Sequence, residues 1–125
     1  MISSDDSLFS FEQLRAWQEA RMLTKQVYEL CSNFPDYEKY ALSSQIRRAM
    51  ISVTSNIAEG SGRNSVKEKI HFLEIAYGSM AEVYSQLVVA VDLGYIDKEE
   101  VENMKPSFAF TLKLMRGLKY KFAEE

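Results

Sequence analysis

Residues 70–93 read IHFLEIAYGSMAEVYSQLVVAVDL, and this stretch decides the fold. Its apolar residues alternate steps of three and four, the heptad pattern of a helix that packs against other helices. Of these 24 residues 16 are apolar and three are acidic, and none is lysine or arginine. A helix that is apolar on nearly all sides must be covered on nearly all sides. Three partner helices in one chain rarely achieve this, so the pattern predicts a subunit interface. The predicted seam is Ile70, Leu73, Tyr77, Met80, Tyr84, Leu87 and Val91.

The segment nearest the N-terminus predicts a first helix that begins at Ser10. Ser10 and Gln13 fit a capping box, and Phe9 with Leu14 fits a hydrophobic staple. The helix should end before Pro35, because the residue preceding a proline is driven out of the helical region. The expected buried stripe is Ala16, Ala20, Leu23, Val27, Leu30 and Phe34.

A second helix is predicted from about Tyr40 to Glu59. Gly60 follows at the position where a left-handed residue commonly ends a helix, and Gly62 allows a tight turn. The buried stripe of this helix is expected at Leu42, Ile46, Ala49, Val53 and Ile57.

Capping boxes also mark the starts of the third and fourth helices. Ser65 and Glu68 precede the 70–93 stretch, and Asp97 and Glu100 open the last helix. Pro106 should kink this last helix or split it into a short and a long piece. The expected buried seam is Val101, Met104, Phe108, Met115, Leu118 and Phe122.

Four helices joined by loops of about two to six residues predict antiparallel neighbours. The fold class is therefore all-α, an antiparallel up-down-up-down four-helix bundle. We expect one bundle domain over residues 10–125, preceded by a flexible N-terminal segment over residues 1–9.

The composition is that of an ordinary soluble domain, with 125 residues that are 46% hydrophobic and 26% charged. A single cysteine, Cys31, excludes an internal disulfide and is expected to be buried. The N-terminal MISSDDSLF carries two acids and no basic region, unlike a secretory signal. No apolar run reaches the roughly 18 residues of a membrane span. We therefore expect a cytoplasmic protein.

Few residues suggest catalysis or metal binding. Glu68 and His71 form Glu-x-x-His, half of the ligand set of a carboxylate-bridged di-iron site, but the chain has one histidine and a subunit cannot complete the set. The loop over residues 60–65, GSGRNS, lacks the glycine and lysine pattern of a phosphate loop and follows a helix. We expect no enzyme activity, and no catalytic, cofactor-binding or metal-binding residue.

Glu74 and Glu82 are carboxylates on the apolar 70–93 helix, where an unpaired buried charge would be costly. The second helix offers a matching polar stripe, so we expect a buried network in which Arg48 pairs with Glu82 and fixes the helix register. A catalytic carboxylate pair is the alternative, although no nucleophile or second base accompanies it. The expected network consists of Gln45, Arg48, Asn56, Glu59 and Glu82.

The charges are unevenly placed along the predicted bundle, although 15 basic and 18 acidic residues give a net charge of only −3 and a pI near 5.3. A protein that coats nucleic acid usually has a pI above about 9. In an antiparallel bundle, however, one end gathers eight cations against few acids. Two interpretations of these cations stay open. They can be placed favourably against the helix dipoles, or they can form a surface that binds a phosphate backbone. The eight cations are Arg15, Arg63, Lys67, Lys69, Lys113, Arg116, Lys119 and Lys121.

Two runs in the centre of the chain carry a resemblance to a known family. They are SQIRRAMISVTSNIAEGSGRNS over residues 44–65 and FLEIAYGSMAEVYSQL over residues 72–87. They closely resemble the bacterial four-helix-bundle family named after proteins encoded in 23S ribosomal RNA intervening sequences, which includes the accessory variability proteins of diversity-generating retroelements. The similarity extends from FEQLRAWQEAR at residues 11–21 to LMRGL at residues 114–118. Thr54 departs from the family, which commonly has proline there.

The resemblance implies a cytoplasmic, non-enzymatic bundle that assembles into a ring, typically a pentamer. Retroelement members of the family look basic and are thought to bind nucleic acid and a reverse transcriptase. No catalytic residue comes with the resemblance. It implies a structural role for the matching motif residues, which are Gln45, Arg48, Asn56, Glu59, Gly60, Gly62, Arg63 and Glu82.

Taken together, the sequence predicts a homo-oligomeric scaffold that binds RNA, DNA or a nucleic-acid-processing protein, with no membrane partner. Two alternatives stay open, a protein-binding adaptor that uses the acidic end and a metal-dependent enzyme assembled between subunits. The expected nucleic-acid contacts are Arg15, Arg63, Lys67, Lys69, Arg116, Lys119 and Lys121.

Overall fold

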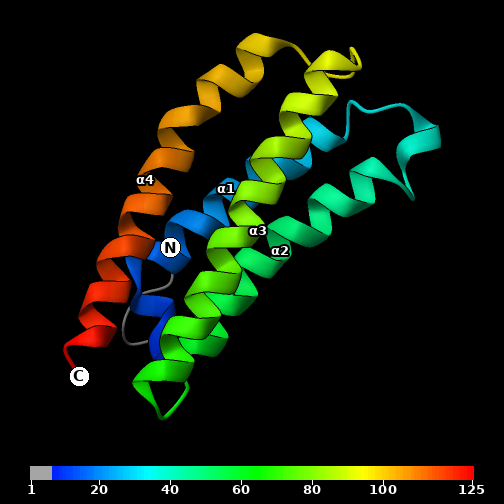
Figure 1. Ribbon diagram of the computed structural model, residues 1–125. Coiled ribbons are helices and arrows are strands. Elements are labelled where there is room, and N and C mark those ends of the chain that lie inside the picture. Colours follow the sequence, from blue (N-terminus) through cyan, green and yellow to red (C-terminus); the bar gives the residue numbers. More distant parts are fainter. Residues whose placement is uncertain (1–6) are drawn as a thin grey trace.

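The protein is an all-α four-helix bundle, as the sequence predicts (Figure 1). The computed structural model describes residues 7–125, so residues 1–6 of the predicted flexible segment 1–9 lie outside the described residues. Two short 3-10 helices, η1 and η2, accompany the four long helices. The elements are η1 (Ser10–Gln13), α1 (Arg15–Cys31), η2 (Asp36–Glu38), α2 (Leu42–Ser61), α3 (Val66–Asp92) and α4 (Lys98–Ala123).

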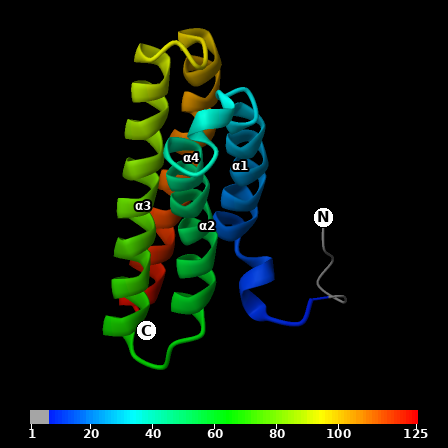
Figure 2. The same ribbon diagram turned by 90° about the vertical axis from the view of Figure 1, so that its right-hand side faces the viewer.

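Each helix packs against the next one along the chain, and α4 also packs against α1 to close the bundle. The start of α1, the loop between α2 and α3, and the end of α4 lie at one end of the molecule (Figures 1 and 2). The chain therefore brings together the three segments that carry the eight cations. We call this end of the bundle the basic end.

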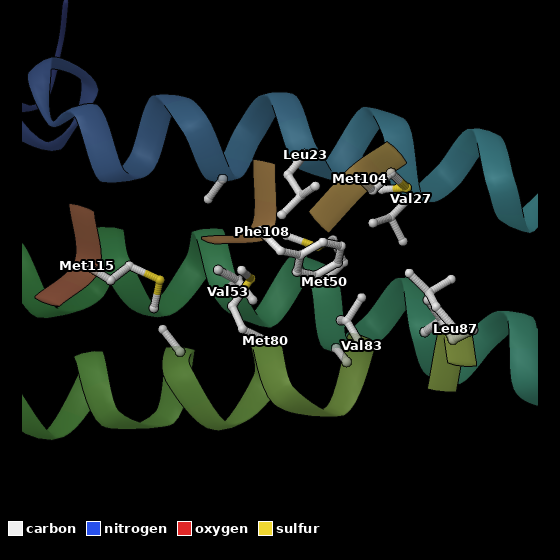
Figure 3. Packing of buried hydrophobic residues seen from close by; sticks show 14 of the residues in the cluster. Leu23, Val27, Met50, Val53, Met80, Val83, Leu87, Met104, Phe108 and Met115 are labelled. Carbon is white, nitrogen blue, oxygen red and sulfur yellow. The ribbon is translucent and has the colours of Figure 1, made fainter. Parts of the chain in front are cut away.

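The core is built from side chains of all four helices, which meet along the bundle axis (Figure 3). Leu23, Met50, Met80 and Leu87 are at most 1% exposed, and Phe108 enters the same cluster from α4. Among the described residues Ser43 and Thr111 are polar and buried, and the Thr111 hydroxyl donates to the backbone carbonyl of Ser107. The predicted buried stripes of the first and fourth helices are confirmed at every position.

The predicted start of the first helix is wrong. Residues 10–13 form η1, and the chain is extended at Leu14 before α1 begins at Arg15. The capping carboxylate is that of Glu12, which accepts from the amides of Leu8 and Phe9, so Ser10 and Gln13 do not form the predicted box. Phe9 is exposed and stacks on Phe11 in place of the expected staple. Phe11 in turn packs edge-on against the Trp17 ring, with 5.0 Å between the ring centroids.

Gly60 does not end its helix in a left-handed conformation, because α2 continues through it to Ser61. Gly60 is buried where α2 and α3 approach closely. A Cβ at this position would lie 3.0 Å from the Cβ of Phe72 and 3.1 Å from the carbonyl oxygen of Lys69. The absence of a side chain therefore sets the spacing between the two helices. The one residue with a positive φ in residues 7–125 is Gly94, after the end of α3.

The buried seam of α3 is rotated from the predicted one. Leu73, Met80 and Leu87 are buried as expected, but Ala76, Val83 and Ala90 take the remaining positions. The small side chains of Ala76 and Ala90 let α2 pack closely against α3. Tyr77 and Tyr84 of the predicted seam lie toward α4 instead. Within the predicted seam, Tyr77 is 54% exposed, and Ile70, Tyr84 and Val91 are partly buried against the core.

The predicted cap residues of the last two long helices are confirmed, with a full capping box at Asp97 and Glu100 and the serine half of the box at Ser65. The Ser65 hydroxyl accepts from the amide of Glu68, and the Glu100 carboxylate accepts from the amide of Asp97. Of the two alternatives predicted at Pro106, a kink or a split, the split does not occur, because α4 runs unbroken from Lys98 to Ala123. Pro106 is on the exposed face, so the carbonyl that it leaves without a helical donor reaches water.

Candidate nucleic-acid interface

Three of the eight cations at the basic end are held by neighbouring side chains. Arg63 pairs with the carboxylate of Glu59 and stacks on Phe72, with its guanidinium carbon 4.7 Å from the ring centroid. Lys69 is paired with Glu125, and its side chain is only 14% exposed. These contacts fasten the loop between α2 and α3 and the last turn of α4 to the bundle.

Arg15 is the third engaged cation. Its guanidinium carbon lies 5.3 Å from the centroid of the Phe110 ring, which joins the start of α1 to α4. Arg15, Arg63 and Lys69 therefore have structural contacts that account for them without a ligand.

The other five cations of the basic end are exposed, and within residues 7–125 none forms an ion pair or stacks on an aromatic ring. One lies in the first turn of α3 and four lie on the last part of α4. The five free cations are Lys67, Lys113, Arg116, Lys119 and Lys121.

The helix dipole explains only part of this arrangement. Its effect on a charged side chain falls off within the last turn of a helix. Lys121 is in the last turn of α4, which ends at Ala123, but Lys113 and Arg116 lie about two to three turns before that end. A preference for the helix terminus therefore does not account for the cations on the middle of α4.

The opposite end of the bundle is acidic and is held by hydrogen bonds. The Tyr95 hydroxyl donates to the carboxylate of Glu38 at 2.7 Å and lies 3.2 Å from the Tyr37 hydroxyl. These two hydrogen bonds, together with the negative charge of Glu38, raise the pKa of the Tyr95 phenol. The acids grouped here are Asp36, Glu38, Asp92, Asp97, Glu99, Glu100 and Glu102.

The predicted polar network between the second and third helices exists in a different form. Gln86 donates to Gln45 across the interface and to Glu82 on its own helix, both at 3.2 Å. Arg48 and Glu82 are both exposed and do not pair, so the buried ion pair predicted from the sequence is wrong. Within one subunit Glu82 is exposed and keeps its hydration, so it needs no buried partner there.

The rest of the predicted network consists of contacts within and close to α2 and one hydrogen bond from α3. Asn56 donates to the carbonyl and hydroxyl oxygens of Ser52, and the Ser79 hydroxyl of α3 donates to Ser52 at 2.9 Å. Glu59 is occupied by Arg63. These contacts join α2 to α3 along one edge and place no charged pair in the core.

In the part of the chain that the structure describes, the residues considered for a metal site lack the further ligands that such a site needs. Glu68 and His71 are exposed, and His71 packs edge-on against the Phe72 ring. Residues 7–125 contain no group of three or more histidine, cysteine, aspartate or glutamate side chains that could hold a metal ion. Cys31 is buried as expected, and burial raises the pKa of its thiol. No helix of this part of the chain is long and apolar enough to cross a bilayer.

A groove between α3 and α4 is the feature that the sequence did not reveal. Two cavities lie along it, of about 290 Å³ and about 350 Å³, and Tyr77 lines both. The first opens at the basic end and is lined by Leu73, Glu74, Tyr77, Met115, Arg116 and Lys119. The heptad pattern placed Tyr77 in the core, because Tyr77 follows Leu73 by four residues. This spacing does not indicate that a groove separates Tyr77 from α4.

The comparisons with known proteins agree with this fold. The family model described as 23S rRNA-intervening sequence protein matches residues 12–117. A crystal structure of a protein with unknown function from the S23 ribosomal protein family of Bacteroides thetaiotaomicron VPI-5482 is similar, with a TM-score of 0.72. It is 21% identical, over 83% of this chain and 97% of that chain, so the similarity shows the fold alone. No curated protein matches the sequence.

Proposed function

Since the chain belongs to the 23S rRNA-intervening sequence protein family, we propose that it is a cytoplasmic, non-enzymatic homo-oligomer that binds nucleic acid through its basic end. The observation that carries the proposal is the set of five free cations at one end of the bundle. These cations repel one another, and a phosphate backbone that lies over them neutralises this repulsion. An acidic net charge does not oppose this, because seven of the 18 acids lie at the far end, where screening weakens their effect over more than about 10 Å. Of the acids at the basic end, Glu59 and Glu125 are already paired with Arg63 and Lys69.

The nucleic-acid proposal is tested by the salt dependence of binding. We expect a fluorescein-labelled RNA or DNA oligonucleotide to bind at about 50 mM salt and to lose most of its affinity by about 200 mM. Four or five phosphate contacts predict a slope of about −3 to −4 in a plot of log affinity against log salt concentration. Fluorescence anisotropy measures this directly. No binding of either oligonucleotide at the lower salt concentration would refute the proposed function.

The outer face of α3 supports the homo-oligomer. Ile75, Val88, Val89 and Leu93 are between 38% and 53% exposed, although each is apolar. Gly78 lies among them, and a Cβ added there would meet nothing within 4 Å. Glycine destabilises a helix by about 1 kcal/mol relative to alanine, so nothing within the subunit favours it at this position. A second copy that packs closely against this face accounts for both features.

We expect light scattering to give a mass several times the 14.4 kDa of one chain. Val89→Glu should reduce that mass, since it replaces an apolar side chain of this face with a carboxylate one heptad after Glu82, so two like charges would be brought into the interface. Met22→Glu is the matched control, because Met22 is 62% exposed on α1 and should tolerate the same change. A wild-type protein that stays a monomer at micromolar concentration would rule out this interface.

A further inference from the structure

We propose that the groove between α3 and α4 is a site for single-stranded nucleic acid, in which one base enters the first cavity against the ring of Tyr77. The proposal rests on the proposed function, since it names which nucleic acid the basic end takes and where a base lies. α3 and α4 run side by side along the groove (Figure 1), and the first cavity opens among the free cations of α4.

The cavity has the size and the walls of a site for one flat ring. Its volume of about 290 Å³ is just below the range of drug-sized ligand sites, which span about 300–1,000 Å³, and therefore suits a single ring. Leu73 and Met115 are each 3% exposed and form an apolar floor, whereas Tyr77 is 54% exposed. An exposed aromatic ring beside an apolar floor is a stacking platform for a base.

The charges at the rim match a nucleotide. Arg116 and Lys119 line the cavity, and neither forms an ion pair within the described chain. Glu74 is the third charged group, so the three side chains together carry a charge of +1, which one phosphodiester neutralises. A purely apolar ligand would leave all three charges uncompensated, and a bare phosphate would leave the apolar floor exposed.

The groove favours a single strand over a duplex. In a duplex each base is stacked and paired, so it cannot enter a cavity without being extruded at a cost of a few kcal/mol. A single strand has unstacked bases and can follow the groove. The second cavity continues it with an apolar lining that includes Tyr84 and Phe108, and it has room for a neighbouring base on the other side of Tyr77.

Glu74 gives the site a preference among bases. A carboxylate has two acceptor oxygens, and guanine is the neutral base that presents two adjacent N–H donors on its Watson–Crick edge. That edge is free in a single strand. The geometry therefore favours guanine over uracil in the first cavity.

The experiment measures the affinity of two labelled RNA dodecamers, one of alternating G and U and one of U alone, with DNA versions and a duplex of equal length. Anisotropy is read at low salt for the wild type, Tyr77→Ala, Tyr77→Phe and Glu74→Ala. Tyr120→Ala is the control, because Tyr120 is 65% exposed on α4 and lines neither cavity. The mass of each variant is checked by light scattering.

We expect Tyr77→Ala to weaken single-strand binding about tenfold, with Tyr77→Phe and Tyr120→Ala close to wild type and duplex binding unchanged. Glu74→Ala should abolish the preference for the dodecamer that contains guanine while it strengthens binding of the U dodecamer. Equal effects of Tyr77→Ala and Tyr120→Ala would overturn the groove assignment and leave the proposed function standing. Dissociation of the oligomer by Tyr77→Ala would also overturn it, since the groove would then be a contact between copies. Failure of every oligonucleotide to bind would refute the proposed function itself.

Discussion

Gly60→Val is expected to lower the free energy of unfolding by about 3 kcal/mol. The new Cβ would lie 3.0 Å from the Cβ of Phe72 and 3.1 Å from the carbonyl oxygen of Lys69. Neither atom is at the flexible end of a side chain, so relief requires α2 and α3 to separate. That separation loses packing along the closest helix pair of the bundle. Urea denaturation followed by circular dichroism, at one fixed protein concentration, measures the change.

Gly117→Val is the matched control for this effect. Gly117 is also inside a helix, but a Cβ added there meets nothing within 4 Å. Valine and glycine differ by only a few tenths of a kcal/mol in helix propensity, so stability should change by less than about 0.5 kcal/mol. If both variants lose the same stability, the cost comes from the substitution and not from the close approach of α2 and α3.

Reversing three charges on α4 is expected to weaken nucleic-acid binding by more than about 100-fold at low salt. The variant carries Lys113→Glu, Arg116→Glu and Lys119→Glu, all at free and exposed positions. Each lost phosphate contact also removes counterion release, so the salt slope should become shallower by about 2 to 3. Arg63 is a poorer choice for such a test, because its substitution would also break the contacts with Glu59 and Phe72.

The control for net charge is a second triple variant with Lys25→Glu, Lys39→Glu and Lys98→Glu. It changes the net charge by the same amount at exposed positions away from the basic end. We expect it to weaken binding only by a small factor that salt removes. Equal losses in the two variants would mean that the total charge, and not its placement, governs binding.

Much of the fold could be predicted because helical periodicity marks buried faces directly. Residues spaced by three and four, such as Leu23 and Val27 of α1, lie on one face of any helix, and the structure buries them. The caps at Ser65 and Asp97 were also predictable, because a cap is a local interaction between residues within four positions of each other.

The features that the sequence could not predict depend on the distance between two helices. The role of Gly60 comes from Phe72 and Lys69 on another helix, and the turn of Tyr77 away from the core comes from the position of α4. A heptad pattern predicts burial for the residues on both sides of a seam. It therefore cannot distinguish the side of α3 that packs against α2 from the side that borders a groove.

The sequence predicted which charged residues lie at the site, but not which of them are paired and which are free. The sequence placed eight cations at one end, and the structure brings their segments together there. It could not reveal that Lys69 is paired with Glu125 or that Arg15 stacks on Phe110, because these partners are distant in the chain. The same limit explains the error at Arg48 and Glu82, whose types match an ion pair that the geometry does not form.

We expect the segments of α4 before and after Pro106 to differ in dynamics. Pro106 has no amide hydrogen, so one backbone hydrogen bond of the helix is missing. Local opening of the first turns therefore need not spread through the remainder of the helix. The half after Pro106 is held by Met115, Leu118 and Phe122. Amides near Lys98 should therefore exchange with deuterium sooner than those near Met115. The four cations that α4 contributes to the basic end lie on the slowly exchanging segment after Pro106.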